Sequence, residues 1–306
     1  MTAKVFSARA SAHAKVNLGL AVLARRGDGF HEIETAMARV GLADDVTVAV
    51  ADASQDVVTL RLSVEGGTPA ADLTDGGANL AHRAATDYLA ARRAADPAAP
   101  GAAVTVTLHK RVPVGAGLGG GSADAGAVLR LLAELLPGSV DAAALAARLG
   151  SDVPFMLGTA HAALAKGRGE RLASLDLPRL HLVLANPGFA VSAGDAYQAL
   201  MGFTPRLRLE RALERLAAGE EPGWPNGLQP GVLRLRPEVR GVLTALREAG
   251  LAGVLMSGSG PTCFGVATGA EHAARTAELL AARHPGWWVL ADATLAGATT
   301  GGVSGA

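Results

Sequence analysis

The stretch Pro113-Val114-Gly115-Ala116-Gly117-Leu118-Gly119-Gly120-Gly121-Ser122-Ala123 decides how this sequence is interpreted. It follows an alternating apolar segment that ends near Lys110 and precedes the helical pattern of residues 127–136, so it joins a predicted strand to a predicted helix. Glycine lets backbone amides approach a ligand closely, and a helix start offers free N–H groups and a positive dipole end. The stretch therefore predicts a phosphate-binding loop, with the Ser122 hydroxyl available to a phosphate or to Mg²⁺. A flexible turn is the alternative, but a linker need not lie at a strand-to-helix junction.

Three familiar phosphate loops fit this stretch poorly. The P-loop requires Gly-Lys-Ser/Thr at its end, and no lysine follows here. The dinucleotide pattern G-x-G-x-x-G matches at Gly115, Gly117 and Gly120, but a second helical segment at 141–149 replaces the acid-ended strand that this fold needs. A protein-kinase loop lies between two strands instead of before a helix.

Composition excludes several classes of protein. The 306 residues carry 28 basic and 28 acidic side chains, and a zero net charge argues against coating nucleic acid or a membrane surface. With 49% hydrophobic residues, the chain predicts a large globular core. The single Cys263 excludes an intramolecular disulfide framework. We also expect no signal peptide and no membrane span, and hence a cytoplasmic protein.

Strand and helix patterns alternate along the whole chain. Strands are predicted at 5–23 and 46–63, with a loop over 25–34, and again at 103–113, 181–186 and 287–295, and residues 253–267 are predicted to form a strand, a glycine turn and a second strand. Helices are predicted at 78–95, 127–136, 142–149, 193–201, 207–218, 236–250 and 271–286, with Asp141 as the N-cap of the helix at 142–149. We therefore predict an α+β fold of two domains, residues 1–160 and 161–306, with a site in the cleft between them.

The glycine stretch resembles the P-x-x-x-G-L-G-S/G-S-A signature of the GHMP small-molecule kinases. The segments 14–18 (AKVNL) and 257–264 (SGSGPTCF) resemble the first and third motifs of that superfamily. The resemblance implies an N-terminal domain like ribosomal protein S5, a C-terminal ferredoxin-like domain and ATP on the loop. It also implies a phosphate-bound Mg²⁺, in keeping with the lack of an acidic cluster in the sequence.

Two further stretches narrow the resemblance. Residues 26–33 (RGDGFHEI) and 150–154 (GSDVP), together with AKVNL, are similar to 4-diphosphocytidyl-2-C-methyl-D-erythritol kinases of the non-mevalonate isoprenoid pathway. That family implies phosphorylation of the 2-hydroxyl of the cytidylylated methylerythritol. The sequence departs from the family pattern at Gly227, where an aspartate is usual, and at Ala193, where a threonine is usual; both put secondary substrate contacts in doubt.

Phosphoryl transfer to an alcohol needs a group near the hydroxyl and positive charge for the transition state. Asp152 is the candidate base, although from the residues alone it is equally a turn or helix cap. Only four of the 28 basic residues are lysines, so Lys15 inside an apolar strand is unusual, and we expect it to stabilise charge on the transferring oxygen; the alternative is a solvent-facing strand residue. Asn17 shares its strand face and offers a donor and an acceptor to a substrate hydroxyl.

The remaining candidates flank these groups. Phe30 and His31 suit a pyrimidine by stacking and hydrogen bonding, and the resemblance assigns them to the cytosine. Arg168 lies in a turn that resembles one lining the family's substrate cleft. Lys110 either anchors the nucleotide or is exposed, and Asn79 either lies beside ATP or caps its helix.

Two rival functions stay open at this point. A different GHMP kinase, acting on homoserine or mevalonate, would share the loop without needing a pyrimidine pocket. A non-catalytic nucleotide sensor would need neither Lys15 nor Asp152. We expect the protein to act on small molecules as a monomer or weak homodimer.

Overall fold

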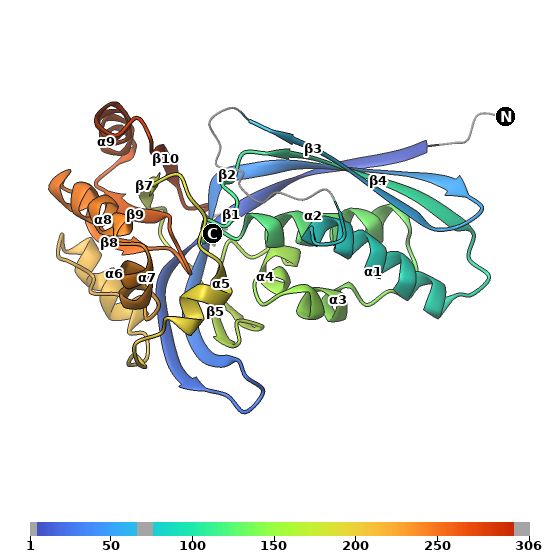
Figure 1. The fold of residues 1–306 in the computed structure, drawn as a ribbon, viewed down its shortest axis with the longest axis horizontal. Coiled ribbons are helices and arrows are strands. Elements are labelled where there is room, and N and C mark those ends of the chain that lie inside the picture. The colour runs from blue at the N-terminus through green and yellow to red at the C-terminus, as the bar shows by residue number, and fades with distance from the viewer. Residues whose placement is uncertain (1–4, 66–75, 297–306) are drawn as a thin grey trace, which may run out of the picture.

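The computed structural model describes residues 5–65 and 76–296 and contains two β-sheets with helices packed on them (Figure 1). The larger sheet has the order β3-β4-β2-β5-β6, with β1 paired to β2. Its strands are β1 (Val5–Arg25), β2 (His31–Ala53), β3 (Val57–Val64), β4 (Gly101–Lys110), β5 (Ala162–Gly167) and β6 (Arg171–Ser174). The helices α1 (Leu80–Ala95), α2 (Gly120–Leu135), α3 (Ala142–Leu149) and α4 (Val153–Leu157) lie on one side of this sheet (Figure 1).

Strands β1 and β2 form one long antiparallel hairpin. The strand predicted at 46–63 is wrong as a single element, because the chain breaks at 54–56 and divides it between the end of β2 and β3. The predicted loop at 25–34 shrinks to a turn at 26–30, in which the amide of Arg26 donates to the carbonyl of Phe30 at 2.8 Å. Residues 33–40 are all buried. A strand buried on both faces lacks the alternation that marks a half-exposed strand, which is why β2 was underestimated.

Helix α2 begins at Gly120, seven residues before the predicted helix. Its N-cap is Gly119, whose φ of 69° lies in the left-handed region that favours glycine. Gly120, Gly121, Ser122 and Ala123 therefore form the first turn of a helix, and the loop proper is shorter than predicted. The early helix start went unrecognised because glycines are poor helix formers.

The C-terminal sheet has the order β10-β7-β9-β8. Its strands are β7 (His181–Asn186), β8 (Ala252–Met256), β9 (Cys263–Ala267) and β10 (Trp288–Ala293), joined by α8 (Glu238–Glu248) and α9 (Ala270–Arg283). This β-α-β-β-α-β order is that of a ferredoxin-like unit and confirms the predicted α+β class. Three shorter helices lie between β7 and α8: α5 (Ala193–Gln198), α6 (Leu209–Ala217) and α7 (Gln229–Leu235); the last was not predicted.

A hydrophobic cluster between the two sheets decides which way β1 faces. Val16 and Leu18 are fully buried there, in the same cluster as Leu182 and Phe264 of the C-terminal sheet. Because successive strand residues alternate in direction, Lys15 and Asn17 face the opposite side of β1, toward α2 and α4. Core packing thus presents the polar residues of β1 to the site.

The two halves of the chain are joined by backbone contacts at two places along the hairpin. Isolated bridges link Leu20 to Asn226 and Val40 to Thr294. The larger sheet takes β5 and β6 from residues beyond 160, and the domain boundary at 160/161 stays a prediction. Within residues 5–65 and 76–296, no helix is long and apolar enough to cross a membrane.

Candidate active site

The glycine loop leaves β4 at Lys110 and enters α2 at Gly120. Gly115, Gly117 and Gly119 have φ values of 63°, 75° and 69°, which other residues adopt only with strain. Ala123 makes the first helical hydrogen bond, to Gly119 O at 2.9 Å. The amides that precede it at the start of α2 are free of helical partners and suit an anion.

A second glycine turn, residues 257–260, supports the loop from behind. The Ser257 hydroxyl donates to Gly117 O at 3.0 Å, and the Thr262 amide donates to Ala116 O at 3.3 Å. A methyl group added at Gly117 would lie 2.2 Å from Ser257 O. The turn at 257–260 therefore packs directly against the backbone of the glycine loop.

Lys15 is buried, with 3% of its surface exposed, so the alternative of a solvent-facing lysine is wrong. Its Nζ lies 3.3 Å from Asp152 Oδ2 and donates to Asn17 Oδ1 at 2.5 Å and to Gly117 O at 3.3 Å. Its backbone amide donates to Leu118 O at 2.9 Å. Lys15 therefore links β1, the glycine loop and Asp152.

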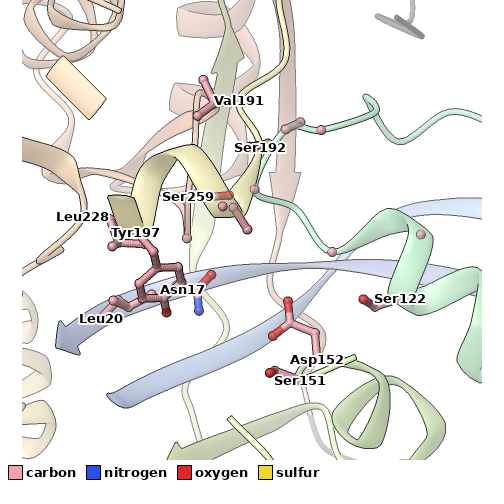
Figure 2. Close-up of a pocket in the computed structure, with 18 of the residues that line it drawn as sticks. Asn17, Leu20, Ser122, Ser151, Asp152, Val191, Ser192, Tyr197, Leu228 and Ser259 are labelled. Carbon is pink, nitrogen blue, oxygen red and sulfur yellow. The ribbon is translucent and has the colours of Figure 1, made fainter. Parts of the chain in front are cut away.

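Asp152 occupies the N-cap position of α4, but its side chain makes no capping hydrogen bond. Its side chain is 32% exposed, and the carboxylate points into the space between the strand of Asn17 and the helix start at Ser122 (Figure 2). The capping alternative therefore describes its backbone only. The carboxylate is available to a ligand beside Lys15.

Asn17 is oriented by a residue that the sequence did not reveal. Its Nδ2 donates to Thr35 Oγ1 at 2.8 Å, and the Thr35 hydroxyl donates to Gly19 O at 2.7 Å. The amide oxygen is thereby turned toward Lys15 Nζ. One N–H and one lone pair of Asn17 remain for a ligand. Thr35 lies within the buried part of β2 that was predicted as loop or left unassigned, so no sequence signal pointed to it.

The tip of the β1–β2 hairpin carries the aromatic candidates. Phe30 is 51% exposed, and the Arg168 guanidinium lies 4.8 Å from the centre of its ring. His31 stacks on Tyr197 of α5 with ring centres 5.0 Å apart. Burial first and the charge of Arg25 second lower the pKa of His31, so its imidazole is neutral at pH 7 and can both donate and accept. Tyr197 was not identified from the sequence as a site residue. The one available signal was that tyrosine occurs only twice in the chain.

Lys110 lies beneath the loop in a buried group of charges. Its Nζ contacts Asp44 and lies 2.5 Å from Asp124 Oδ2, and only 2% of the residue is exposed. The alternative of an exposed lysine is therefore wrong, while its contact with a nucleotide stays a prediction. Asn79 does cap α1, since its Oδ1 accepts from the Ala81 amide at 2.9 Å.

One cavity of about 1370 Å³ brings most of these residues together. Its lining includes Lys15, Asn17, Phe30, His31, Asn79, Lys110, Pro113, Val114, Gly115, Ala116, Gly117, Gly119, Gly120, Gly121, Ser122, Asp152 and Arg168. Leu118 and Ala123, predicted for the same site, are instead buried in the core at 1% and 2% exposure. In the described part of the chain, no group of three or more His, Cys, Asp or Glu residues is arranged to hold a metal ion.

Comparisons with known proteins identify the family of this chain. Residues 79–159 match the family described as GHMP kinases N terminal domain, and residues 206–285 match GHMP kinases C terminal. A 4-diphosphocytidyl-2-C-methyl-D-erythritol kinase of Deinococcus radiodurans is 49% identical over 92% of this chain and 91% of its own. The chain belongs to the 4-diphosphocytidyl-2-C-methyl-D-erythritol kinase family.

Solved structures place this kinase family member on the GHMP fold. A crystal structure of a 4-(cytidine 5'-diphospho)-2C-methyl-D-erythritol kinase superposes with a TM-score of 0.75 at 43% identity, covering 94% of this chain and all of the other. A homoserine kinase of Cytophaga hutchinsonii gives a TM-score of 0.63 at 19% identity over 95% of each chain, which shows a shared fold alone. The expected two-part GHMP architecture is thus confirmed.

Proposed function

We propose that this kinase transfers the γ-phosphoryl group of ATP to the 2-hydroxyl of 4-diphosphocytidyl-2-C-methyl-D-erythritol. The single observation that carries the proposal is the Lys15–Asp152 pair, 3.3 Å apart, beside the glycine loop in the cavity that also holds Phe30 and His31. The names of the relatives support this substrate.

In the proposed reaction, the substrate hydroxyl lies against the Asp152 carboxylate. The oxygen attacks the γ-phosphorus, the bond from that phosphorus to the β-phosphate oxygen breaks, and the hydroxyl proton passes to Asp152. Lys15 neutralises negative charge that develops on the transferring oxygens, and its bonds to Asn17 and Gly117 keep its ammonium in place.

The glycine loop and the start of α2 are proposed to hold the ATP phosphates through backbone amides. Mg²⁺ suits this site, because the Ser122 hydroxyl lines the cavity and hard oxygen donors together with phosphates are what Mg²⁺ prefers. The bound ion supplies neutralisation of the phosphate charge. Asn79 and Lys110 also line the cavity and are proposed to lie next to the nucleotide.

Phe30, His31 and Arg168 are proposed to recognise the cytosine end of the substrate. The aromatic ring offers a stacking face, and the neutral imidazole can pair with a pyrimidine edge. Tyr197 extends this wall by stacking on His31. A kinase whose alcohol substrate carries no nucleobase would have no need of these groups.

A substrate panel tests the proposal. ATP consumption is measured with the cytidylylated methylerythritol, homoserine and mevalonate, and the phosphorylated product is identified by mass. We expect turnover with the cytidylylated alcohol alone, and a rise in its KM for the double variant Phe30→Ala/His31→Ala. Equal turnover of homoserine or mevalonate would point to another GHMP kinase, and nucleotide binding without any turnover would favour a sensor.

A further inference from the structure

Helix α4 is five residues long, yet charged side chains hold both of its ends. At its start, Asp152 lies beside Lys15. At its end, the Gly158 amide donates to Pro154 O at 3.2 Å, which leaves the later carbonyls of the helix without a helical donor. Something outside the helix has to satisfy them.

Two arginines supply those donors. Arg39 Nη2 donates to Phe155 O at 2.7 Å, Met156 O at 3.2 Å and Gly158 O at 2.7 Å. Arg130 Nη1 donates to Met156 O at 2.5 Å and to Leu157 O at 3.2 Å. The last four carbonyls of this turn are therefore bound by two guanidinium groups, one from β2 and one from α2.

Burying the guanidinium groups of Arg39 and Arg130 costs folding free energy, which argues that these side chains do more than fill space in the core. Arg39 is only 7% exposed, and neither guanidinium has a carboxylate partner within residues 5–65 and 76–296. Burial, followed by repulsion from Arg130, lowers the pKa of Arg39 to about 10, and burial also lowers the pKa of Arg130. Burying unpaired charge opposes folding unless the carbonyls and the helix dipole compensate for it.

The geometry ties this pair to the active site. Lys15 and Arg39 are directly opposite each other in the β1–β2 register, so one cross-strand pair reaches the two ends of α4. On the other side, a methyl group at Gly126 would lie 2.7 Å from the backbone of Met156, so α2 and α4 touch backbone to backbone. Arg130 stands one helical turn after Gly126, on the same face of α2.

We propose that Arg39 and Arg130 are positioning residues that fix α4 and thereby hold the Asp152 carboxylate beside Lys15. The proposal rests on the catalytic roles proposed above for those two residues. It assigns the arginines no contact with substrate. Asp152 makes no capping bond of its own, so its position depends on where α4 lies.

Arg130→Met tests the proposal, because Arg130 is less buried than Arg39 and methionine keeps the length of the side chain. We expect kcat to fall ten- to hundredfold, since small misplacement of a catalytic group has effects of that size, while KM for ATP and for the cytidylylated substrate changes less than about twofold. Arg130→Lys, which keeps a donor, is expected to recover part of the loss. It also serves as the second variant if the methionine protein folds poorly.

Arg93→Met is the matched control. Arg93 also donates to a backbone carbonyl, that of Ala99, and also lies half-buried, but it belongs to α1 and contacts Asp56 instead of α4. Its loss is expected to lower the urea unfolding midpoint without changing kcat of the folded enzyme.

A double-mutant cycle distinguishes positioning from a general loss of structure. In an Asp152→Asn background, Arg130→Met is expected to lower kcat less than about threefold, because the group it positions is already gone. An equal loss in both backgrounds, or an unchanged kcat with lower stability, would overturn the positioning role and leave Asp152 as the base. Wild-type turnover by Asp152→Asn alone would instead overturn the proposed function itself.

Discussion

Replacing Gly117 by alanine is the sharpest test of how the loop is built. Gly117 has a φ of 75°, and its added methyl group would lie 2.2 Å from Ser257 O and 2.7 Å from the Gly260 amide nitrogen. Both neighbours are backbone atoms, so they cannot move aside as a flexible side chain does. The variant must displace either the loop or the turn at 257–260.

The expected cost follows from two contributions. A residue other than glycine in this region of φ costs about 1–2 kcal/mol, and overpacking against rigid neighbours costs about 1–3 kcal/mol. Their sum is about 2–5 kcal/mol, a large share of a typical unfolding free energy of about 5–15 kcal/mol. The same displacement moves the carbonyl of Gly117 away from Lys15 Nζ and disturbs the proposed phosphate site.

Urea unfolding measures the first effect, and titration calorimetry with ADP measures the second. Gly241→Ala is the control: it lies inside α8 with no atom within 4 Å of the added methyl group, so alanine is expected to stabilise the protein by about 0.5–1 kcal/mol. If Gly117→Ala unfolds at the wild-type urea concentration and binds ADP with wild-type affinity, the described contact between loop and turn is wrong.

Two other variants probe the buried charges and the aromatic wall. Burial raises the pKa of Asp124 from 3.8 to about 7, so the folded protein binds this proton more tightly than the unfolded chain and the unfolding free energy falls as the pH rises between those values. Asp124→Asn is expected to make that fall smaller when urea unfolding is compared near about pH 5 and about pH 8; an unchanged fall would contradict the assignment. Tyr197→Ala removes the stack on His31 and is expected to raise KM for the cytidylylated substrate about three- to tenfold while KM for ATP stays constant, and a change in the ATP value alone would refute that role.

Local signals in the sequence predicted much of the fold. Asn79 and Asp141 each cap a helix through a side chain that bonds an amide two or three residues on, and such short-range chemistry is visible in the sequence. Most helices and strands were therefore anticipated. The long β2 was not, because burial on both faces removes the alternation by which strands are recognised.

The candidate site likewise contains some residues that local sequence predicts and others that only the fold brings together. The glycine loop and Lys15 stand out by type and spacing, whereas their partners depend on contacts distant in sequence. Lys110 meets Asp44 across 66 positions, and Arg39 meets the end of α4 across more than a hundred. The periodicity of apolar residues in the sequence does not predict these long-range contacts, because they follow from strand register and from how α2 packs against α4.

Asp152 is proposed to remove the proton from the substrate hydroxyl. Single-turnover rate and substrate affinity of Asp152→Asn, measured with ATP and the cytidylylated methylerythritol, test it most directly, because asparagine keeps the shape of the side chain but not its basicity. We predict a rate lower by about 10²- to 10⁴-fold with affinity for the alcohol nearly unchanged. A rate within about threefold of the wild type would contradict the assignment of Asp152 as the base.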